Sequence, residues 1–466
     1  MNLVNLIQFL RDRLKTLIWI AYAILALVVV LDAIPAIVDK EHAHTALERW
    51  PGFWALYGFV ACVLIIILSK WYGHLGIMTR EDYYEDGAEA PPSPGAATSA
   101  SGGARSIPDR LASRSLPHTG MGTLRRGGTM TNLWFHPALV LILGALLLPL
   151  VPTSLKKGYL LLIPILLFAR ILTLARGEFG QVHFLDWTLV FGRVDALSSV
   201  FGYIMSLMCI IGTLYGLHVK DDSQHIAAWF YVAGSIGCIY AGDFITLFLF
   251  WELMAFSSVF LIWFRGRRES LSAGYRYLLV HIAGGVILLA GIVLHCKAPG
   301  HDWSFNQLDV HHPTTAIYLI MAGFILNAAV PPLHAWLPDA YGEATFNGSV
   351  FMCAFTTKTA VYALCRGFAG MEILVPLGVI MALYGVVYAV LENDCRRLLA
   401  YHIISQVGYM VAGVGLGTEM AINGACAHAF AHILYKGLLF MGCGAVLHMT
   451  GQSKFTELGG LWKKMP

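Results

Sequence analysis

The segment ITLFLFWELMAFSSVFLIWF, residues 245–264, contains one charged residue, Glu252, among twenty mostly apolar residues. A helix of about 20 residues is about 30 Å long, which matches the hydrocarbon core of a membrane. Inside lipid only helices and closed barrels satisfy every backbone polar group, and an uninterrupted apolar run of this length favours a helix. The segment therefore predicts a transmembrane helix with an ionisable carboxyl near its middle.

The whole chain has the same apolar character. Of its 466 residues, 57% are hydrophobic and only 13% are charged, with a formal net charge of +3. Soluble domains carry about 25% charged residues, so this composition indicates a membrane protein. The nearly neutral charge gives no indication of nucleic-acid binding. The nine cysteines form no CxxC pair, and we expect no cofactor, disulfide framework or resident metal.

Apolar runs divide the chain into three parts. Two runs, near 16–38 and 53–72, predict a two-helix membrane extension over residues 1–73. Residues 74–132 are acidic and then rich in Pro, Gly, Ala and Ser, which predicts a disordered linker. Within residues 133–466, eleven further runs predict spans near 134–152, 157–175, 192–217, 224–241, 243–265, 272–296, 314–332, 345–368, 371–391, 398–417 and 420–449. The expected fold is an all-α, polytopic membrane protein with about 13 transmembrane helices.

Lysine and arginine gather in the loops that follow the odd-numbered spans of residues 133–466, and Arg267, Arg396 and Arg397 are examples. The positive-inside rule places these loops in the cytoplasm and explains the arginines as topology determinants. The N-terminal pair conflicts with this orientation. Its basic residues at 11–15 favour a cytoplasmic start. Two spans would return the chain to the cytoplasm, where it began. The orientation of residues 133–466, however, predicts that the end of the linker is outside. The sequence leaves this conflict open.

The stretch AGFILNAAVPPLHAWLPDAYGEAT, residues 322–345, predicts an interrupted helix. Proline removes a backbone donor and clashes with the preceding turn, so a break is expected between Pro331 and Pro338. Non-helical backbone at membrane depth faces protein or a wet cavity, and broken helices are common at transport sites. The alternative, weighed equally, is a helix that ends at the membrane interface with Trp336 as its anchor.

Two lysines share the intramembrane position of Glu252. Lys358 lies midway along SVFMCAFTTKTAVYALCRGF (349–368), and Lys436 lies within NGACAHAFAHILYKGLLFMGCGAV (423–446). A charge at mid-bilayer costs at least about 2.5–3.5 kcal/mol, so such residues are functional candidates by default. The plainer alternatives are a neutral, hydrogen-bonded glutamic acid and a lysine that reaches the interface. The central position of Lys358 argues against the second.

His428, His432 and Lys436 are spaced i, i+4, i+8 and share one helix face. Imidazoles titrate near neutral pH and pass protons, which makes this face a candidate proton relay. A structural histidine pair is one alternative. A metal site is another, but no companion Glu or Cys supports it.

Several strings resemble a known family in order and spacing, namely FWELMAFSS, PPLHAWLPDAYGEAT, TTKTAVYAL, ENDCRRLLAYHIISQVGYM, HAFAHILYKGLLFM and ELGGLWKKMP. From about residue 134 to 466 the chain resembles the proton-translocating, antiporter-like subunits of respiratory complex I, membrane-bound hydrogenases and Mrp-type Na⁺/H⁺ antiporters. Among these it most resembles the D-type member of the Mrp antiporters. The first 130 residues lie outside the resemblance and look like a fused two-helix accessory subunit.

The resemblance implies a fold with fourteen core helices and two inverted repeats, each with a broken helix. Glu252, Lys358 and Lys436 correspond to charged residues on the fifth, eighth and eleventh helices, which line a hydrated axis for protons. With His334, His428 and His432 they form the expected proton pathway. The resemblance also implies partner subunits in a hetero-oligomeric complex of the prokaryotic plasma (inner) membrane. Sodium is an alternative cargo, and the coupled reaction is either antiport or redox chemistry of the NADH/quinone or hydrogenase type.

Two departures from the family pattern stand out. Asn327 occupies the position of the lysine that pairs with the glutamate, so the usual switch is altered here. The sequence also ends at Pro466, before about three further helices of the family. These departures favour the alternative of a non-pumping structural subunit. A third hypothesis, an enzyme that acts on a lipid or quinone through His334 and Asp339, rests only on polar residues at the helix break.

Overall fold

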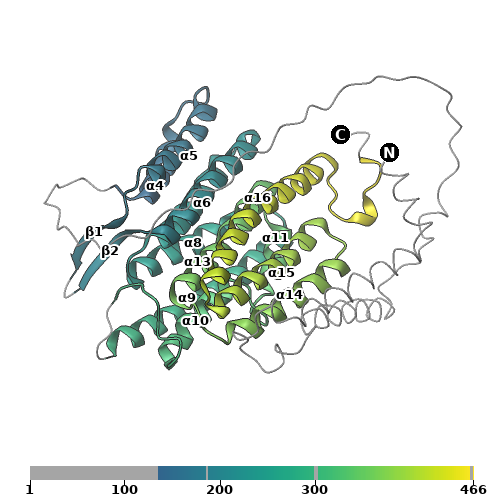
Figure 1. The fold of residues 1–466 in the computed structure, drawn as a ribbon. Helices are drawn as coiled ribbons and strands as arrows, with labels where there is room; N and C mark the ends of the chain where they lie inside the picture. The colour runs from purple at the N-terminus through teal and green to yellow at the C-terminus, as the bar shows by residue number, and fades with distance from the viewer. Residues whose placement is uncertain (1–134, 185–186, 299–302, 462–464, 466) are drawn as a thin grey trace, which may run out of the picture. The chain divides into compact units, whose positions relative to one another are not determined.

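The computed structural model describes residues 135–184, 187–298, 303–461 and 465, and the predicted extension 1–73 and linker 74–132 lie outside this part. Its helices are α4 (Pro137–Leu147), α5 (Lys156–Leu172), α6 (Ala196–Tyr215), α7 (Asp222–Tyr240), α8 (Phe244–Trp263), α9 (Arg268–Lys297), α10 (Thr315–Asn327), α11 (Trp336–Glu343), α12 (Phe346–Ala354), α13 (Thr356–Gly367), α14 (Leu374–Leu391), α15 (Cys395–Leu416) and α16 (Glu419–Thr450) (Figure 1). Each of the eleven predicted spans corresponds to a helix, or to α12 and α13 together. The helical membrane fold is confirmed.

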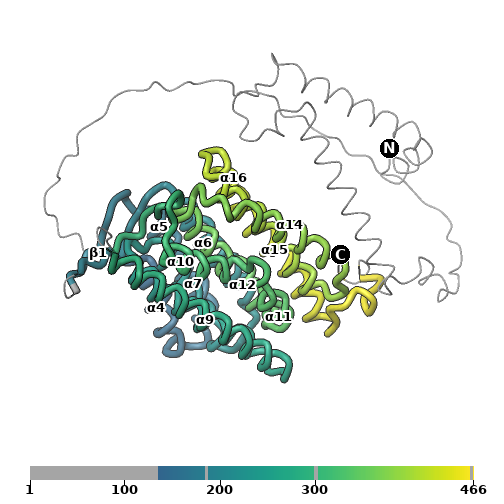
Figure 2. The backbone as a smooth tube through the Cα atoms, turned by 90° about the horizontal axis from the view of Figure 1, so that it is seen from below, coloured from purple at the N-terminus to yellow at the C-terminus, as the bar shows by residue number. Residues whose placement is uncertain are grey.

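The C-terminal helices pack closely through glycines. In Figures 1 and 2, α14, α15 and α16 lie side by side. A Cβ on Gly378 of α14 would lie 2.5 Å from the carbonyl oxygen of Gly408 on α15, so only small residues allow this approach. Outward-facing positions stay apolar, such as Val390 on α14 and Leu438 on α16, which are 71% and 69% exposed. Such a surface suits lipid or other membrane subunits.

The loops sort to two ends of the helical bundle. At one end, Arg265 after α8 donates to the carbonyl of Gly342 at 2.6 Å, and the Cys395 amide donates to the carbonyl of Ser453 at 2.9 Å. At the other end, the Gly370 amide donates to the carbonyl of Val414 at 2.9 Å. The loops after odd-numbered predicted spans therefore meet at one end, as alternate crossings of a membrane require.

Arg396 corrects one prediction. Its side chain is 1% exposed, and its Nη2 donates to the carbonyls of Ala344 and Thr345 at 2.8 and 3.3 Å. Arg396 therefore ties the start of α15 to the junction of α11 and α12, and a role as a loop topology determinant does not account for it.

A two-stranded antiparallel sheet was not predicted. It pairs β1 (Gly177–Phe184) with β2 (Trp187–Val194). The apolar residues of β2 join the following helix in the sequence, and the span predicted at 192–217 therefore began too early. Asp195 separates the two, because its carboxylate accepts the Ser198 amide at 2.9 Å and caps α6.

The broken helix is confirmed, with different bounds. Helix α10 ends at Asn327, where the amide of Ala329 donates to Leu326 O and the amide of Val330 to Ile325 O, both at 3.0 Å. This is a Schellman ending, and it places a non-glycine residue, Ala329, at φ 60°. Pro338 lies within the first turn of α11, where proline is tolerated.

Trp336 does not anchor the helix at the interface. Its side chain is only 4% exposed, and its Nε1 donates to the carbonyl of Leu326 at 3.0 Å. The indole thus bridges the two halves of the broken helix from the inside, and the interface alternative is wrong.

Candidate functional site

Lys358 lies at an interruption between α12 and α13. Phe355 separates the two helices, and Lys358 follows three residues later with no exposed side-chain surface. Its Nζ donates to the carbonyl of Cys353 at 2.7 Å and to Oγ1 of Thr357 at 3.0 Å. The ammonium therefore has two neutral acceptors next to the interruption.

Lys436 is equally buried, on α16. Its Nζ has one long hydrogen bond, 3.4 Å to the carbonyl of Leu399 on α15. Within the described part of the chain, no carboxylate lies within 4 Å of Lys436 or Lys358. Two amines thus share the interior of one bundle without an acidic counterion.

His432 joins the two lysines. Its ring is fully buried, and neither ring nitrogen has a hydrogen-bond partner. It lies within electrostatic range of Lys358 and Lys436 and stacks on His428 with 6.0 Å between ring centroids. We call Lys358, His428, His432 and Lys436 the lysine cluster. The structure brings together these four residues of the predicted pathway.

Glu252 lies in a different setting, on α8 beside α9. Its Oε1 is buried without a hydrogen-bond partner, and the described residues place no cation in an ion pair with it. A Cβ on Gly285 would collide with this oxygen. Glycine at 285 therefore makes room for the carboxyl group.

Asn327 is the last residue of α10, 1% exposed, with a buried Nδ2 that has no partner. The preceding residue, Leu326, places Cδ1 3.0 Å from where a Cβ on Gly284 would lie. The end of α10 and Glu252 therefore approach consecutive glycines of α9. Helix α10 thus ends at a neutral amide, Asn327, at the position where the resemblance implies a lysine.

A chain of hydroxyl groups links α8 to α13, and the sequence did not indicate it. Ser258 Oγ and Tyr277 OH lie 2.7 Å apart, and Tyr277 is also hydrogen-bonded to Thr356. Thr356 Oγ1 lies 2.7 Å from the hydroxyl of Tyr231. Thr356 and Lys358 both lie on α13, so this chain joins the helix of Glu252 to the helix of Lys358.

His334 is separate from the lysine cluster. It lies in the break between α10 and α11, with its ring edge-on to Tyr384 at 4.3 Å between centroids. Tyr384 lies 4.3 Å from Tyr388, which lies 5.5 Å from Tyr401. We call these three residues the tyrosine ladder. Only the i, i+4 spacing of Tyr384 and Tyr388 could have suggested it from sequence.

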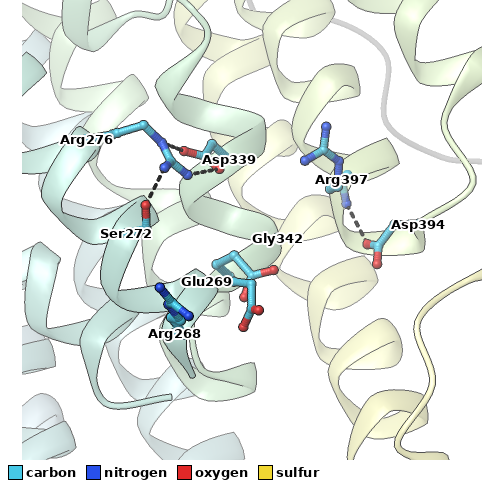
Figure 3. Close-up of a pocket in the computed structure, with 9 residues that line it drawn as sticks. Arg268, Glu269, Ser272, Arg276, Asp339, Gly342, Asp394 and Arg397 are labelled. Carbon is cyan, nitrogen blue, oxygen red and sulfur yellow. Dashed lines mark hydrogen bonds and ion pairs between the residues drawn. The ribbon is translucent and has the colours of Figure 1, made fainter. Parts of the chain in front are cut away.

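The tyrosine ladder ends at Arg397, which is hydrogen-bonded to Tyr401. Arg397 lines a polar cavity of about 560 Å³, shown in Figure 3, at the end of the bundle where α9, α11 and α15 meet. There Arg276 holds Asp339 by two hydrogen bonds of 2.7 and 2.9 Å. The carboxylate of Asp339 is thus engaged by Arg276, which gives the hypothesis of a His334–Asp339 enzyme no support.

At the opposite end of the bundle, an ion pair connects α13 to the residue that caps α6. Arg366 of α13 binds Asp195, the capping residue before α6, at 2.8 and 2.9 Å. Burial opposes ionisation of Asp195, but the hydrogen bond and charge of Arg366, with the Ser198 amide, hold its pKa below the usual value. This pair links the last turn of α13 to the start of α6.

The long apolar helices and the buried amines define a multi-pass membrane protein with charged residues in its interior. Residues 241–466 match the family model described as NADH:quinone oxidoreductase/Mrp antiporter, TM. NADH-quinone oxidoreductase subunit N of Desulforudis audaxviator is 31% identical over 325 residues, which cover 63% of this chain and 64% of that protein. The D-type component of the Na⁺/H⁺ antiporter of Alkalihalophilus pseudofirmus is 28% identical over 308 residues, covering 60% and 62%.

The membrane-bound sulfane sulfur reductase, an archaeal respiratory membrane complex, contains a chain of similar fold. The TM-score is 0.64 at 27% identity, covering 71% of this chain and 59% of that one. The predicted resemblance is therefore confirmed: the chain is similar in sequence to membrane subunits of NADH-quinone oxidoreductases and Na⁺/H⁺ antiporters. It spans a little under two thirds of the length of these two curated relatives.

Proposed function

We propose that this chain conducts protons across the membrane as one subunit of a larger complex. The observation that carries the proposal is the lysine cluster, in which two fully buried amines lie within electrostatic range of a histidine whose ring nitrogens have no hydrogen-bond partner. Unpaired buried charge is costly, and well-packed apolar residues would serve a purely structural role better. The cost is understandable if the cluster takes up and releases protons.

The proposed route begins at Glu252 and follows the hydroxyl chain to Lys358, then His432 and Lys436. A proton on one lysine disfavours a proton on the other, because like charges repel in a medium of low dielectric constant. His432 accepts a proton at one nitrogen and donates from the other, which suits transfer between the two amines. Arrival of one proton thus favours release of another.

Sodium is the alternative cargo at Glu252. Glu252 and the end of α10 approach consecutive glycines of α9, and α10 ends at an amide, Asn327, instead of an ammonium. Carboxylate and amide oxygens are ligands that hard cations prefer. Asn327 therefore favours an altered acid end that binds a proton or a sodium ion without the usual lysine switch.

His334 and the tyrosine ladder supply the proposed access from the polar cavity. The distance between ring centroids is 4.3 Å from His334 to Tyr384, 4.3 Å from Tyr384 to Tyr388 and 5.5 Å from Tyr388 to Tyr401. Tyrosine hydroxyls donate and accept hydrogen bonds, and waters that bridge them would complete a path for protons. On the predicted orientation, the cavity opens to the cytoplasm.

The relatives are subunits of membrane complexes by name, and we propose that this chain also assembles with other membrane subunits in a prokaryotic plasma membrane. Those partners would set the coupled reaction, redox or antiport. A non-pumping structural subunit is the second candidate, because the resemblance implies a titratable lysine at position 327 and this chain has Asn327 there.

One pair of variants separates these candidates. Glu252→Gln and Lys358→Ala should each abolish proton or sodium transport in vesicles that hold the full complex, while subunit assembly stays intact. Lys454→Ala is the matched control, because that side chain is 59% exposed and lies on a loop. Transport that survives both variants in an assembled complex would exclude the conducting role and leave the structural one.

A further inference from the structure

An apolar groove runs along the outer face of α7 and α8. It measures about 420 Å³ and is lined mainly by Ala227, Phe230, Leu253, Phe256, Phe260 and Phe264. Phe256 and Phe260 are 47% and 43% exposed. Leu253 and Phe264 are eleven residues apart, or about 16 Å along a helix, which is close to half the hydrocarbon thickness of a bilayer. The groove thus has the length of one acyl chain in one leaflet.

A polar cavity continues this groove at its Phe264 end. Phe264 also lines a second cavity of about 340 Å³, together with Arg265, Arg267 and His448. Helix α7 contributes to both spaces as well, with Ser223 in the groove and Gln224 in the cavity. The groove and the cavity therefore meet along α7 and at Phe264.

The charges of this cavity favour an anion. Arg265 forms an ion pair with Glu343, with 3.3 Å between Nη1 and Oε2. Arg267 is exposed and has no ion-pair partner among the described residues. His448 adds a third group that can carry positive charge. The basic loops lie at this end of the bundle, the predicted cytoplasmic side, where the leaflet is rich in anionic lipid.

We propose that the groove and the cavity form one binding site for an anionic phospholipid. The acyl chain lies between α7 and α8, and the phosphate lies against Arg267 and Arg265. Continuity with an apolar groove of leaflet depth favours a lipid over free phosphate. The site is independent of proton conduction, although its inner end at Leu253 adjoins Glu252.

The test uses the full chain in neutral detergent, with palmitoyl-oleoyl phosphatidylglycerol as the anionic probe and phosphatidylcholine of the same chains as the neutral one. Phosphatidylglycerol should be retained in native mass spectrometry and should raise the unfolding temperature, and phosphatidylcholine should do neither. Arg267→Gln should weaken phosphatidylglycerol binding about fivefold, because one interfacial basic residue contributes about 1 kcal/mol. Ala227→Trp, which fills the groove, should abolish the retention.

Arg268→Gln is the matched control, because Arg268 is adjacent, also exposed, and lines the other polar cavity. Equal weakening by Arg267→Gln and Arg268→Gln, or equal retention of both lipids, would overturn the site and leave only ordinary boundary lipid. Inorganic phosphate that stabilises the chain as well as phosphatidylglycerol would also overturn it. In the native membrane, a photo-crosslinker at Phe256 should capture lipid, and capture of a protein subunit would assign the groove to a partner helix instead.

Discussion

The proposed proton route has two ends, the lysine cluster and the partly buried Glu252, and these ends differ in how their charges are accommodated. At the lysine cluster, both amines donate to backbone carbonyls, and His432 lies within their electrostatic range. At the acid end, the carboxyl oxygen of Glu252 faces a glycine and has no partner, and Asn327 brings no charge. The basic side chains of Lys358 and Lys436 are thus close together in the lysine cluster, whereas Glu252 has no ion-pair partner among the described residues. The comparison indicates that charge transfer along the proposed route, and not a local acid–lysine pair, would carry the activity.

Among the variants expected to keep some activity, the largest effect is at the lysine end. Lys436→Met should lower proton transport by about 100-fold, the scale on which positioned proton-transfer groups contribute. The measurement is acidification of vesicles that contain the full complex. Leu438→Ala on the same helix is the control, because this residue is 69% exposed. If the two variants transported equally, the lysine cluster would have no part in conduction.

The acid end gives the next effect. Asn327→Lys should place an ammonium in the region of Glu252 and alter the transport rate by about tenfold, since hydrogen bonds to charged groups contribute about 1.5–3 kcal/mol. We expect an increase relative to the wild-type complex, measured in the same vesicles. An unchanged rate would show that the two ends do not differ in the way described.

Much of this comparison was predictable because it depends on local composition. Apolar runs of membrane length gave the eleven spans, lone charges inside them gave Glu252 and Lys358, and clustered prolines gave the break. The remainder depends on which helix faces meet. The hydroxyl chain joins four helices, and the space for Glu252 comes from Gly285 on another helix. The prediction for Arg396 was wrong for the same reason. The sequence beside a loop does not show whether a charged side chain faces water or, like that of Arg396, is buried in protein.

The tyrosine ladder gives a smaller effect. Replacing Tyr384, Tyr388 and Tyr401 together with phenylalanine keeps the rings but removes the hydroxyls. Transport should fall about fivefold, which corresponds to the loss of about one net hydrogen bond along the access route. Tyr318→Phe is the control, since Tyr318 is 43% exposed on α10. A rate equal to that of the control would mean that protons reach the lysine cluster by another route.

The smallest effect concerns the break between α10 and α11. Ala329 has φ 60°, whereas its neighbour Ala328 has φ −72°, and both are fully buried. Changing either to glycine removes the same methyl group, but only at 329 does it relieve a left-handed alanine, which costs about 1–2 kcal/mol. Ala328→Gly should therefore be the less stable variant by about that amount in thermal unfolding. Equal unfolding temperatures would mean that the break stores no backbone strain.

The central claim is that a titratable amine at position 358 is required for transport. The most direct measurement compares proton transport by Lys358→Cys before and after treatment with bromoethylamine, which converts the thiol into a lysine-like amine. Wild-type complex given the same treatment is the control for the other cysteines. We predict no transport by the untreated variant and recovery after treatment. Wild-type transport by the untreated variant, in an assembled complex, would contradict the account.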